Sequence, residues 1–292
     1  IGPPGVGKTM VGKRIPGILP PLSYSEMLEV TKIYSISGLL GPDRPMVTER
    51  PFRAPHHGIS SSALIGGGSV PRPGEVSLAH KGILFLDELP EFEARTLDML
   101  RQPLEEKQVT VTRINGRSVF PADMMLIAAM NPCRCGWFGD PTHVCTCSET
   151  VRKKYVGKVS GPLLDRIDIH VVMERLVYED LSSLPSVPSL SSSQLRLGVE
   201  QAIRIQEERY KGTGIAANSS LTPQLISRYC TLDAAGEEIM KAAFANLQLS
   251  ARAYHKALKL ARTIADTQGS EAISADHVLE ALSYRTPEKY FS

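Results

Sequence analysis

The chain begins Ile1-Gly2-Pro3-Pro4-Gly5-Val6-Gly7-Lys8-Thr9, and residues 2–9 fit the phosphate-binding loop pattern G-x-x-x-x-G-K-[ST] without a gap. Glycines in such a loop let the backbone turn its N–H groups inward around phosphate oxygens. Lys8 is expected to reach the β- and γ-phosphates, and the Thr9 hydroxyl to bind Mg²⁺. The stretch therefore predicts a site for ATP with Mg²⁺; the alternative is a chance glycine-rich turn.

A second motif supports this prediction. The apolar run Ile83-Leu84-Phe85-Leu86 ends in Asp87-Glu88. Such a run predicts a buried strand that delivers two carboxylates at its C-terminal end, where an open α/β sheet binds its ligands. We expect Asp87 to hold the Mg²⁺ shell and Glu88 to polarise the attacking water.

The phosphate loop also bears on the completeness of the core. Such a loop normally follows a hydrophobic strand that lies centrally in the sheet, but only Ile1 precedes Gly2 here. We therefore expect the chain to be a fragment that lacks the first strand, with its native N-terminal part removed or not included.

The composition is ordinary for a globular protein, with 42% hydrophobic residues in a chain of 292 that can hold two domains. No apolar run approaches the ~20 residues that span a bilayer, so no membrane partner is expected. The net charge is only +2, so contact with nucleic acid would need a local basic patch. An ATP-dependent protein is expected in the cytoplasm, where the five cysteines favour metal binding over disulfides.

The N-terminal part alternates between helix and strand patterns. Helices are expected at 7–15, 25–33 and 92–102, strands at 83–86, 125–130 and 167–173, a β-hairpin at 109–120 around Asn115-Gly116, and an insertion with little regular core at 38–80. Leu97 and Leu100 share one face of the third helix, Pro103 should end or kink it, and Leu104 extends its apolar face.

The C-terminal part has a helical pattern only. Helices are expected at 194–211, 223–229, 234–248, 251–267 and 275–283, after a low-complexity serine-rich stretch. The predicted fold class is thus α/β, with a P-loop core (a parallel sheet flanked by helices) over 1–181, a linker at 182–193 and a small all-helical lid domain over 194–292.

Four cysteines form two Cys-x-Cys pairs, Cys133 with Cys135 and Cys145 with Cys147. Four converging thiolates would make a closed tetrahedral zinc site, in which His143 could replace one thiolate. The alternative is a loop that carries four reduced thiols. Cys230 stands alone on a predicted helix and is expected to be a buried small hydrophobe.

Taken together, the motifs resemble the AAA+ ATPase family, in its magnesium chelatase-like branch and within that the ComM/YifB group. The resemblance covers nearly the whole chain. It rests on the two motifs above and on RPFRAPHHG at 50–58, ALIGGG at 63–68, PRPGEVSLAH at 71–80, LDELPEF at 86–92, NPCRCG at 131–136 and SGPLLDRID at 160–168.

The resemblance implies further site residues. Asn131 would sense the γ-phosphate, and the alternative is an Asn-Pro turn. Arg166 would be the arginine finger that reaches the neighbouring subunit's site, unless it only pairs with Asp165 or Asp168. Arg252 would be the sensor-2 arginine of the lid, or else an ordinary exposed helix residue.

The hairpin and the ring are also implied by the resemblance. In ring ATPases of this branch the hairpin lines the central channel, where Arg113 and Arg117 could grip DNA phosphates; the alternative is a solvated hairpin end. His56 and His57 show no spaced carboxylate partner, so ordinary polar packing is expected of them in preference to the alternative, a metal site.

The implied function is that of an ATP-hydrolysing subunit of a hexameric ring motor. It would act on DNA as a helicase in branch migration during DNA uptake and recombination. One alternative is a chelatase-type motor that drives metal insertion through a partner. Another is a regulatory or assembly module that binds ATP and hydrolyses it poorly.

Overall fold

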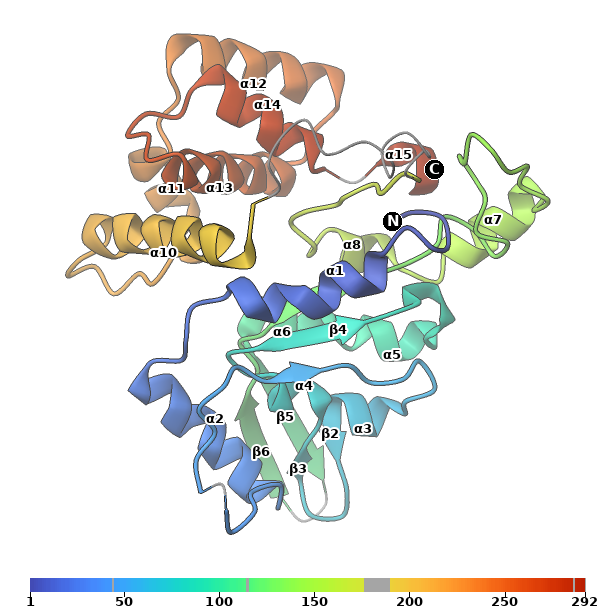
Figure 1. Cartoon of the computed structure of the whole chain (residues 1–292), viewed down its shortest axis with the longest axis vertical. Coiled ribbons are helices and arrows are strands. Elements are labelled where there is room, and N and C mark those ends of the chain that lie inside the picture. Colours follow the sequence, from blue (N-terminus) through green and yellow to red (C-terminus); the bar gives the residue numbers. More distant parts are fainter. Residues whose placement is uncertain (44, 114–115, 176–189, 286, 292) are drawn as a thin grey trace. The chain divides into compact units, whose positions relative to one another are not determined.

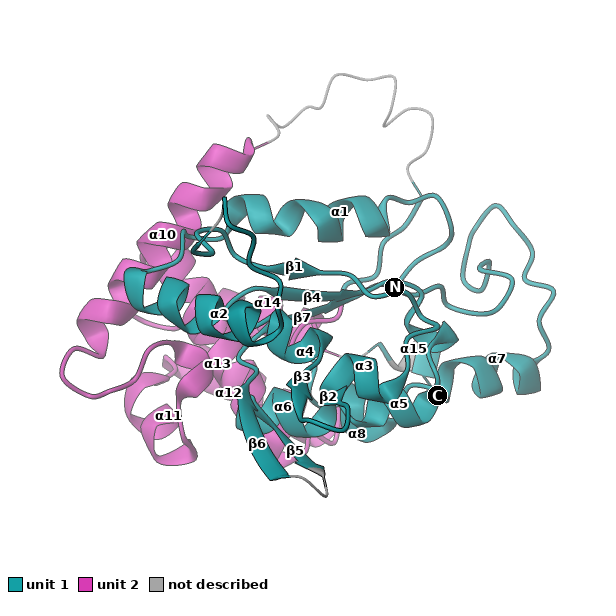
Figure 2. Ribbon diagram, turned by 90° about the horizontal axis from the view of Figure 1, so that it is seen from below, with its two compact units in different colours: residues 1–167, 171–187, 287–292 teal, residues 168–170, 188–286 magenta. Residues whose placement is uncertain are grey.

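The computed structural model describes residues 1–43, 45–113, 116–175, 190–285 and 287–291 (Figure 1). These residues group into two compact units, which Figure 2 draws in different colours. The first unit takes in the described residues of 1–167, 171–187 and 287–292, and the second those of 168–170 and 188–286. Within the described ranges, no helix combines the length and the hydropathy that a bilayer span requires.

The first unit is built on a parallel sheet with the strand order β1-β4-β7 (Figure 2). The strands are β1 (Phe52–Arg53), β4 (Ile83–Leu86) and β7 (Met125–Ala128). All four residues of β4 are buried, as an unbroken apolar run predicts for a central strand. The residues that follow these parallel strands meet at one edge of the sheet, so the predicted α/β fold class is confirmed and its ligand-binding edge is defined.

The first residues of the chain lie beside the segment that follows β7. The Gly2 N–H donates to the Met130 carbonyl at 3.3 Å, and the Met173 N–H donates to the Ile1 carbonyl at 2.7 Å. The prediction of a strand at 167–173 is wrong, because the structure has no regular strand there. The backbone hydrogen bonds given for this segment go to Ile1 and to the Tyr284 carbonyl, whereas a strand requires a ladder of successive partners.

The helices of the first unit flank the sheet and the hairpins. They are α1 (Lys8–Arg14), α2 (Tyr24–Ile36), α3 (Ser61–Ile65), α4 (Glu75–Leu78), α5 (Ala94–Asp98), α6 (Arg101–Glu106), α7 (Glu149–Val156), α8 (Gly161–Leu164) and α15 (Glu288–Phe291), with 3₁₀ turns at Ile15–Ile18 and Leu89–Glu91. Helix α1 packs on β4 so closely that a Cβ at Gly12 would lie 2.5 Å from the Phe85 ring. The phosphate loop is thereby fixed to the central strand.

The expectation of little regular core at 38–80 is wrong. The segment holds β1, α3, α4 and an antiparallel hairpin of β2 (Gly66–Gly67) and β3 (Arg72–Pro73). Leu64 and Val76 are fully buried in the main core. Its glycines allow tight packing of short elements, since a Cβ at Gly74 would lie 2.5 Å from the Gly66 nitrogen.

The helix expected at 92–102 is split into α5 and α6. Leu97 and Leu100 are fully buried and Leu104 packs against the same core, as predicted. Pro103 neither ends nor kinks a long helix, because it is the third residue of α6. A proline is tolerated in the first helical turn, where its missing N–H has no intrahelical partner to lose.

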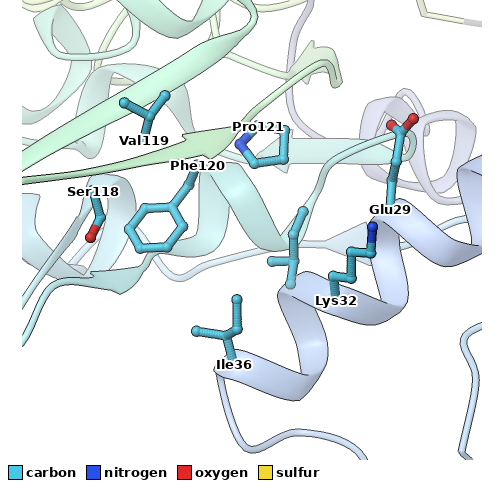
Figure 3. A pocket seen from close by; sticks show the side chains of 8 residues that line it. Glu29, Lys32, Ile36, Ser118, Val119, Phe120 and Pro121 are labelled. Carbon is cyan, nitrogen blue, oxygen red and sulfur yellow. The ribbon is translucent and has the colours of Figure 1, made fainter.

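The predicted β-hairpin is present in the described residues. Strands β5 (Gln108–Arg113) and β6 (Gly116–Pro121) pair antiparallel, with Val109 opposite Phe120; the expected tip at 114–115 lies outside the described ranges. A pocket of about 400 Å³ lies between α2 and β6 (Figure 3). Its lining is Glu29, Lys32, Ile33, Ile36, Ser118, Val119, Phe120 and Pro121. The pocket thus belongs to the base of the hairpin and not to the phosphate loop.

The second unit is helical, as predicted. Its helices are α10 (Ser192–Arg209), α11 (Pro223–Tyr229), α12 (Ala234–Asn246), α13 (Ala251–Thr267) and α14 (Ala275–Ser283). Its core contains a buried ion cluster in which Asp266 pairs with Arg209 and Arg262. Of the predicted linker, residues 182–189 lie outside the described ranges, and Ser191 already caps α10.

Candidate active site

The phosphate loop adopts a conformation that favours glycine at several positions. Gly5 and Gly7 have φ of 83° and 85°, in the left-handed region. A Cβ at Gly2 would lie 2.4 Å from the Met173 carbonyl oxygen. The loop is therefore shaped by its glycines and held between Met130, which follows β7, and residues 171–173.

Lys8 and Asn131 meet across the loop. The Lys8 ammonium donates to the Asn131 Oδ1 at 3.0 Å and to the carbonyls of Gly2 and Pro3, both at 2.6 Å. Burial lowers the pKa of Lys8, and the Asp87 carboxylate opposes this shift. The residue that is expected to bind the phosphates thus lies one hydrogen bond away from the residue that is expected to sense them.

Thr9 and Asp87 form a second contact at this edge of the sheet. The Thr9 hydroxyl donates to Asp87 Oδ2 at 2.7 Å, although the two residues are 78 positions apart. Hydroxyl and carboxylate oxygens are the donors that Mg²⁺ prefers. The donor set therefore fits the Mg²⁺ that the motifs imply, with Thr9 and Asp87 as the residues that would hold it.

Glu88 follows Asp87 in an unusual backbone conformation. Its φ and ψ are 53° and 47°, and its N–H donates to Asp87 Oδ1 at 3.0 Å. The Glu88 side chain is 58% exposed, and its Oε2 lies 3.3 Å from His57 Nδ1. The prediction that His57 has only ordinary polar packing missed this contact, because its carboxylate partner follows a different strand, β4, which pairs with β1.

Arg166 follows the C-cap of α8, Asp165, and is engaged within its own chain. It donates to Glu105 Oε2 at 2.6 Å and to the carbonyls of Arg101 and Pro162. Its partner is thus neither Asp165 nor Asp168, which the sequence had offered as alternatives. Arg252 is an exposed residue in the first turn of α13 in the helical unit. Their roles as finger and sensor stay predictions.

The four cysteines converge. The ligand atoms of Cys133, Cys135, Cys145 and Cys147 all lie within 4.8 Å of one another. The Sγ of Cys133 lies 3.4 Å from that of Cys135 and 3.7 Å from that of Cys145. Four sulfur atoms at this spacing fit the tetrahedral donor set of a structural zinc site.

His143 is occupied elsewhere in the same loop. Its ring stacks on Trp137 at 4.2 Å, and its Nδ1 faces Asp140 Oδ1 at 3.3 Å. The described metal-ligand group consists of cysteines only. Cys230 lies in the core of the helical unit, where burial raises the pKa of its thiol to about 11.

The segment that carries the four cysteines, residues 133–147 (the cysteine loop), touches the phosphate loop. Gly136 has a φ of 87°, and a Cβ there would lie 2.7 Å from Pro4 Cδ. Asn131 and Cys133 are only two positions apart. Residues 131–136 thus include Asn131, which is predicted to be a nucleotide-site residue, two thiols and a contact with the phosphate loop.

The hairpin arginines are described only in part. Arg117 is exposed on β6 and pairs in register with Thr112, and Arg113 ends β5 opposite Gly116. The Arg113 side chain lies outside what the structure describes. DNA contact by these residues stays a prediction.

Comparison with known proteins adds two family matches. Residues 1–181 match the family model of magnesium chelatase, subunit ChlI, and residues 189–285 match that of the ChlI C-terminal region. The chain is 43% identical over 291 residues to the uncharacterized protein YifB of Salmonella typhimurium, and 41% identical over 287 residues to the competence protein ComM of Haemophilus influenzae. These alignments cover 99% and 98% of this chain but 56% and 54% of the relatives. The chain therefore spans about half the length of the curated relatives it matches.

Proposed function

The chain belongs to the magnesium chelatase ChlI family, and on that premise we propose that it is the ATP-hydrolysing subunit of a motor of the ComM/YifB type. The observation that carries this proposal is the gathering of two residue pairs at one edge of the sheet. Thr9 meets Asp87, and Lys8 meets Asn131. Three segments that are far apart in the sequence converge there, which a chance glycine-rich turn would not require.

Each residue has a role in this proposal. Lys8 and the loop N–H groups bind the phosphates of ATP, and Thr9 and Asp87 hold Mg²⁺. Bound Mg²⁺ neutralises charge that develops on the β- and γ-phosphate oxygens. Glu88 accepts a hydrogen bond from the attacking water and orients it, and Asn131 adds a polar contact to the γ-phosphate.

Two substitutions test the assignment in the protein at its natural length. Lys8→Ala is expected to abolish nucleotide binding, since Lys8 contacts the ground-state phosphates. Glu88→Gln is expected to keep ADP and ATP binding but to stop turnover, because Glu88 acts on the water. Normal turnover by the Glu88→Gln protein would refute the role of this carboxylate, and wild-type protein that binds without turnover would favour the regulatory alternative.

We further propose that the active site is completed between subunits of a hexameric ring. One chain would contribute Lys8, Thr9, Asp87, Glu88 and Asn131, and Arg166 of the next chain would supply the finger. Arg252, in the helical unit, would be the sensor-2 arginine and would contact the bound nucleotide. Membership of the magnesium chelatase family supports this arrangement, because the resemblance to that family implies a ring of subunits.

DNA is the substrate that we propose for the motor, in branch migration during DNA uptake and recombination. Support comes from the name of one relative, a competence protein, and from the exposed Arg117 on a regular two-stranded hairpin. Stimulation of ATP hydrolysis by single-stranded or branched DNA tests the proposal. A rate that DNA does not change would favour a chelatase-type motor instead, an alternative that the name of the matched family supports.

We also propose a structural Zn²⁺ on Cys133, Cys135, Cys145 and Cys147. The convergence of the four Sγ atoms supports it, and all four thiols are free. Free thiols suit the reducing cytoplasm, where we place the protein. Elemental analysis of protein purified without chelator tests the site, and a zinc content near zero would refute it.

A further inference from the structure

We propose that metal binding by the cysteine loop regulates the phosphate loop, so that Zn²⁺ on the four thiols raises the affinity for nucleotide. This coupling rests on the proposed ATPase function and on the proposed zinc site. Two sites are coupled when a ligand at one favours the conformation that binds the ligand at the other. The coupling therefore needs a physical connection between the two loops and a change in that connection when zinc is lost.

The connection begins at Gly136. This glycine is buried, its φ is 87°, and a Cβ there would lie 2.7 Å from Pro4 Cδ, so its backbone lies directly against the proline ring. The Gly136 N–H donates to the Cys133 carbonyl at 3.0 Å, which closes a turn that contains Cys135. Two of the four thiols thus belong to the turn that touches the phosphate loop.

The connection continues to the Lys8 ammonium by two routes. Lys8 donates to the Pro3 carbonyl at 2.6 Å, and this carbonyl belongs to the peptide bond that enters Pro4. Lys8 also donates to Asn131 Oδ1 at 3.0 Å, and Asn131 lies two residues before the first cysteine. A movement of the turn at Gly136 would therefore shift hydrogen-bond acceptors that position Lys8.

The conformation of the cysteine loop depends on its sulfur atoms. Among the described residues, none from 134 to 148 belongs to an apolar core cluster, and Val144 is 87% exposed. The Cys145 Sγ lies 3.7 Å from the Sγ of Cys133 and 3.6 Å from that of Cys135, so the two Cys-x-Cys pairs meet through sulfur. Thiolates this close repel one another unless a cation lies between them. A bound metal would fix both pairs and the turn between them, and its loss would release them.

The ends of the cysteine loop have anchors other than metal. Cys133 is fully buried, and Arg152 donates to the Cys147 carbonyl at 3.1 Å. Loss of zinc would therefore free the middle of the loop, which contains Gly136, while the rest of the unit stays folded. The expected consequence is weaker nucleotide binding and not loss of the protein.

The first test is ADP binding by titration calorimetry, in the protein at its natural length. Zinc-loaded wild type is compared with a Cys145→Ser, Cys147→Ser double variant, which loses two thiols but keeps Cys133 beside Asn131. Couplings between sites are commonly about 5- to 150-fold, and we expect the Kd for ADP to rise about tenfold in the double variant. Cys230→Ala is the matched control, because this cysteine lies in the core of the helical unit, and it should bind ADP like wild type.

The second test is the reciprocal measurement, which needs no cysteine variant. Coupling is symmetric, so saturating ADP should raise the zinc affinity of wild type by the same factor of about ten, measured by competition with a chelator. Lys8→Ala protein, which is expected not to bind nucleotide, controls for zinc that ADP itself captures. Pro4→Ala removes the ring that Gly136 touches and should bring the factor close to 1 while zinc still binds.

The outcomes separate this coupling from the proposed function. If wild type binds both ADP and zinc but neither ligand changes the affinity for the other, the coupling is overturned and the ATPase assignment stands. If wild type binds ADP but no zinc, the coupling is overturned together with the zinc site. If wild type binds no ADP, the proposed function itself fails. If the cysteine double variant does not fold, the reciprocal measurement on wild type decides alone, and a Pro4→Ala protein with the full tenfold response would overturn the route through Gly136.

Discussion

Gly136→Ala tests whether the cysteine loop helps to shape the phosphate loop. Gly136 has a φ of 87°, and an added Cβ would lie 2.7 Å from Pro4 Cδ and 3.2 Å from Pro4 Cγ. The proline ring is bonded to its own backbone nitrogen, so it cannot rotate away as a flexible side chain would. Relief of the contact must therefore move one of the two loops.

The magnitude has two parts. Left-handed backbone costs a residue with a Cβ about 1–2 kcal/mol, and overpacking at a close contact costs about 1–3 kcal/mol more. Gly136→Ala should therefore lower the free energy of unfolding by about 2–5 kcal/mol. If about 1.4 kcal/mol of this strain falls on the nucleotide-binding form of the phosphate loop, the Kd for ADP rises about tenfold.

The assay is ADP binding by titration calorimetry together with thermal unfolding. Gly212→Ala is the matched control, because Gly212 has a φ of 75° but open space around its Cβ position. Gly212→Ala should lower the free energy of unfolding by about 1–2 kcal/mol, because alanine is strained in the left-handed region, and should keep the ADP affinity of wild type. The reasoning is refuted if Gly136→Ala binds ADP as tightly as wild type and loses no more stability than Gly212→Ala.

Three further predictions concern the ring, the metal and DNA. Arg166→Ala is expected to lower kcat by about 10³ with nucleotide affinity kept, and mixing it with Lys8→Ala subunits should restore some activity; no rescue in a mixture shown to co-assemble would place the arginine's action within its own chain. Removal of zinc by a chelator should unfold the cysteine loop, which has little apolar content, and make its four thiols reactive to a mild reagent; thiols equally reactive before and after chelation would contradict this. Replacing both Arg113 and Arg117 with Ala should weaken DNA binding but leave basal ATP hydrolysis intact. The slope of log K against log salt should become shallower by the contribution of about two phosphate contacts. If the double variant binds DNA like wild type at every salt concentration, the hairpin has no part in DNA binding.

The parts of the fold that could be predicted from the sequence have local causes. Strand β4 carries an unbroken apolar run, and α11, α13 and α14 have the predicted bounds because helical periodicity and end signals mark them. The prediction that Thr9 and Asp87 lie at one site came from two local motifs and one rule, that ligands bind where parallel strands end.

The features that were missed depend on contacts between segments. Strand β1 has two residues and α4 has four, so neither shows a period that a pattern could reveal. The meeting of His57 with Glu88 depends on the pairing of β1 with β4. Once that pairing is known, the residues after both strands can be expected to meet at one edge of the sheet.

Arg166 shows how a motif can identify a residue without giving its surroundings. The sequence analysis named Asp165 and Asp168 as possible ion-pair partners of Arg166. In the structure the guanidinium pairs instead with Glu105 in α6, and the Arg166 side chain is only 12% exposed. Under the proposed ring mechanism, Arg166 would exchange this carboxylate for the γ-phosphate bound by the neighbouring subunit. An exchange of one anion for another keeps the arginine paired throughout, which avoids the cost of about 3–5 kcal/mol that an uncompensated buried charge carries. Glu105 is 41% exposed, so water can solvate it after the exchange. The intrachain ion pair is therefore compatible with a finger that acts only after subunits assemble.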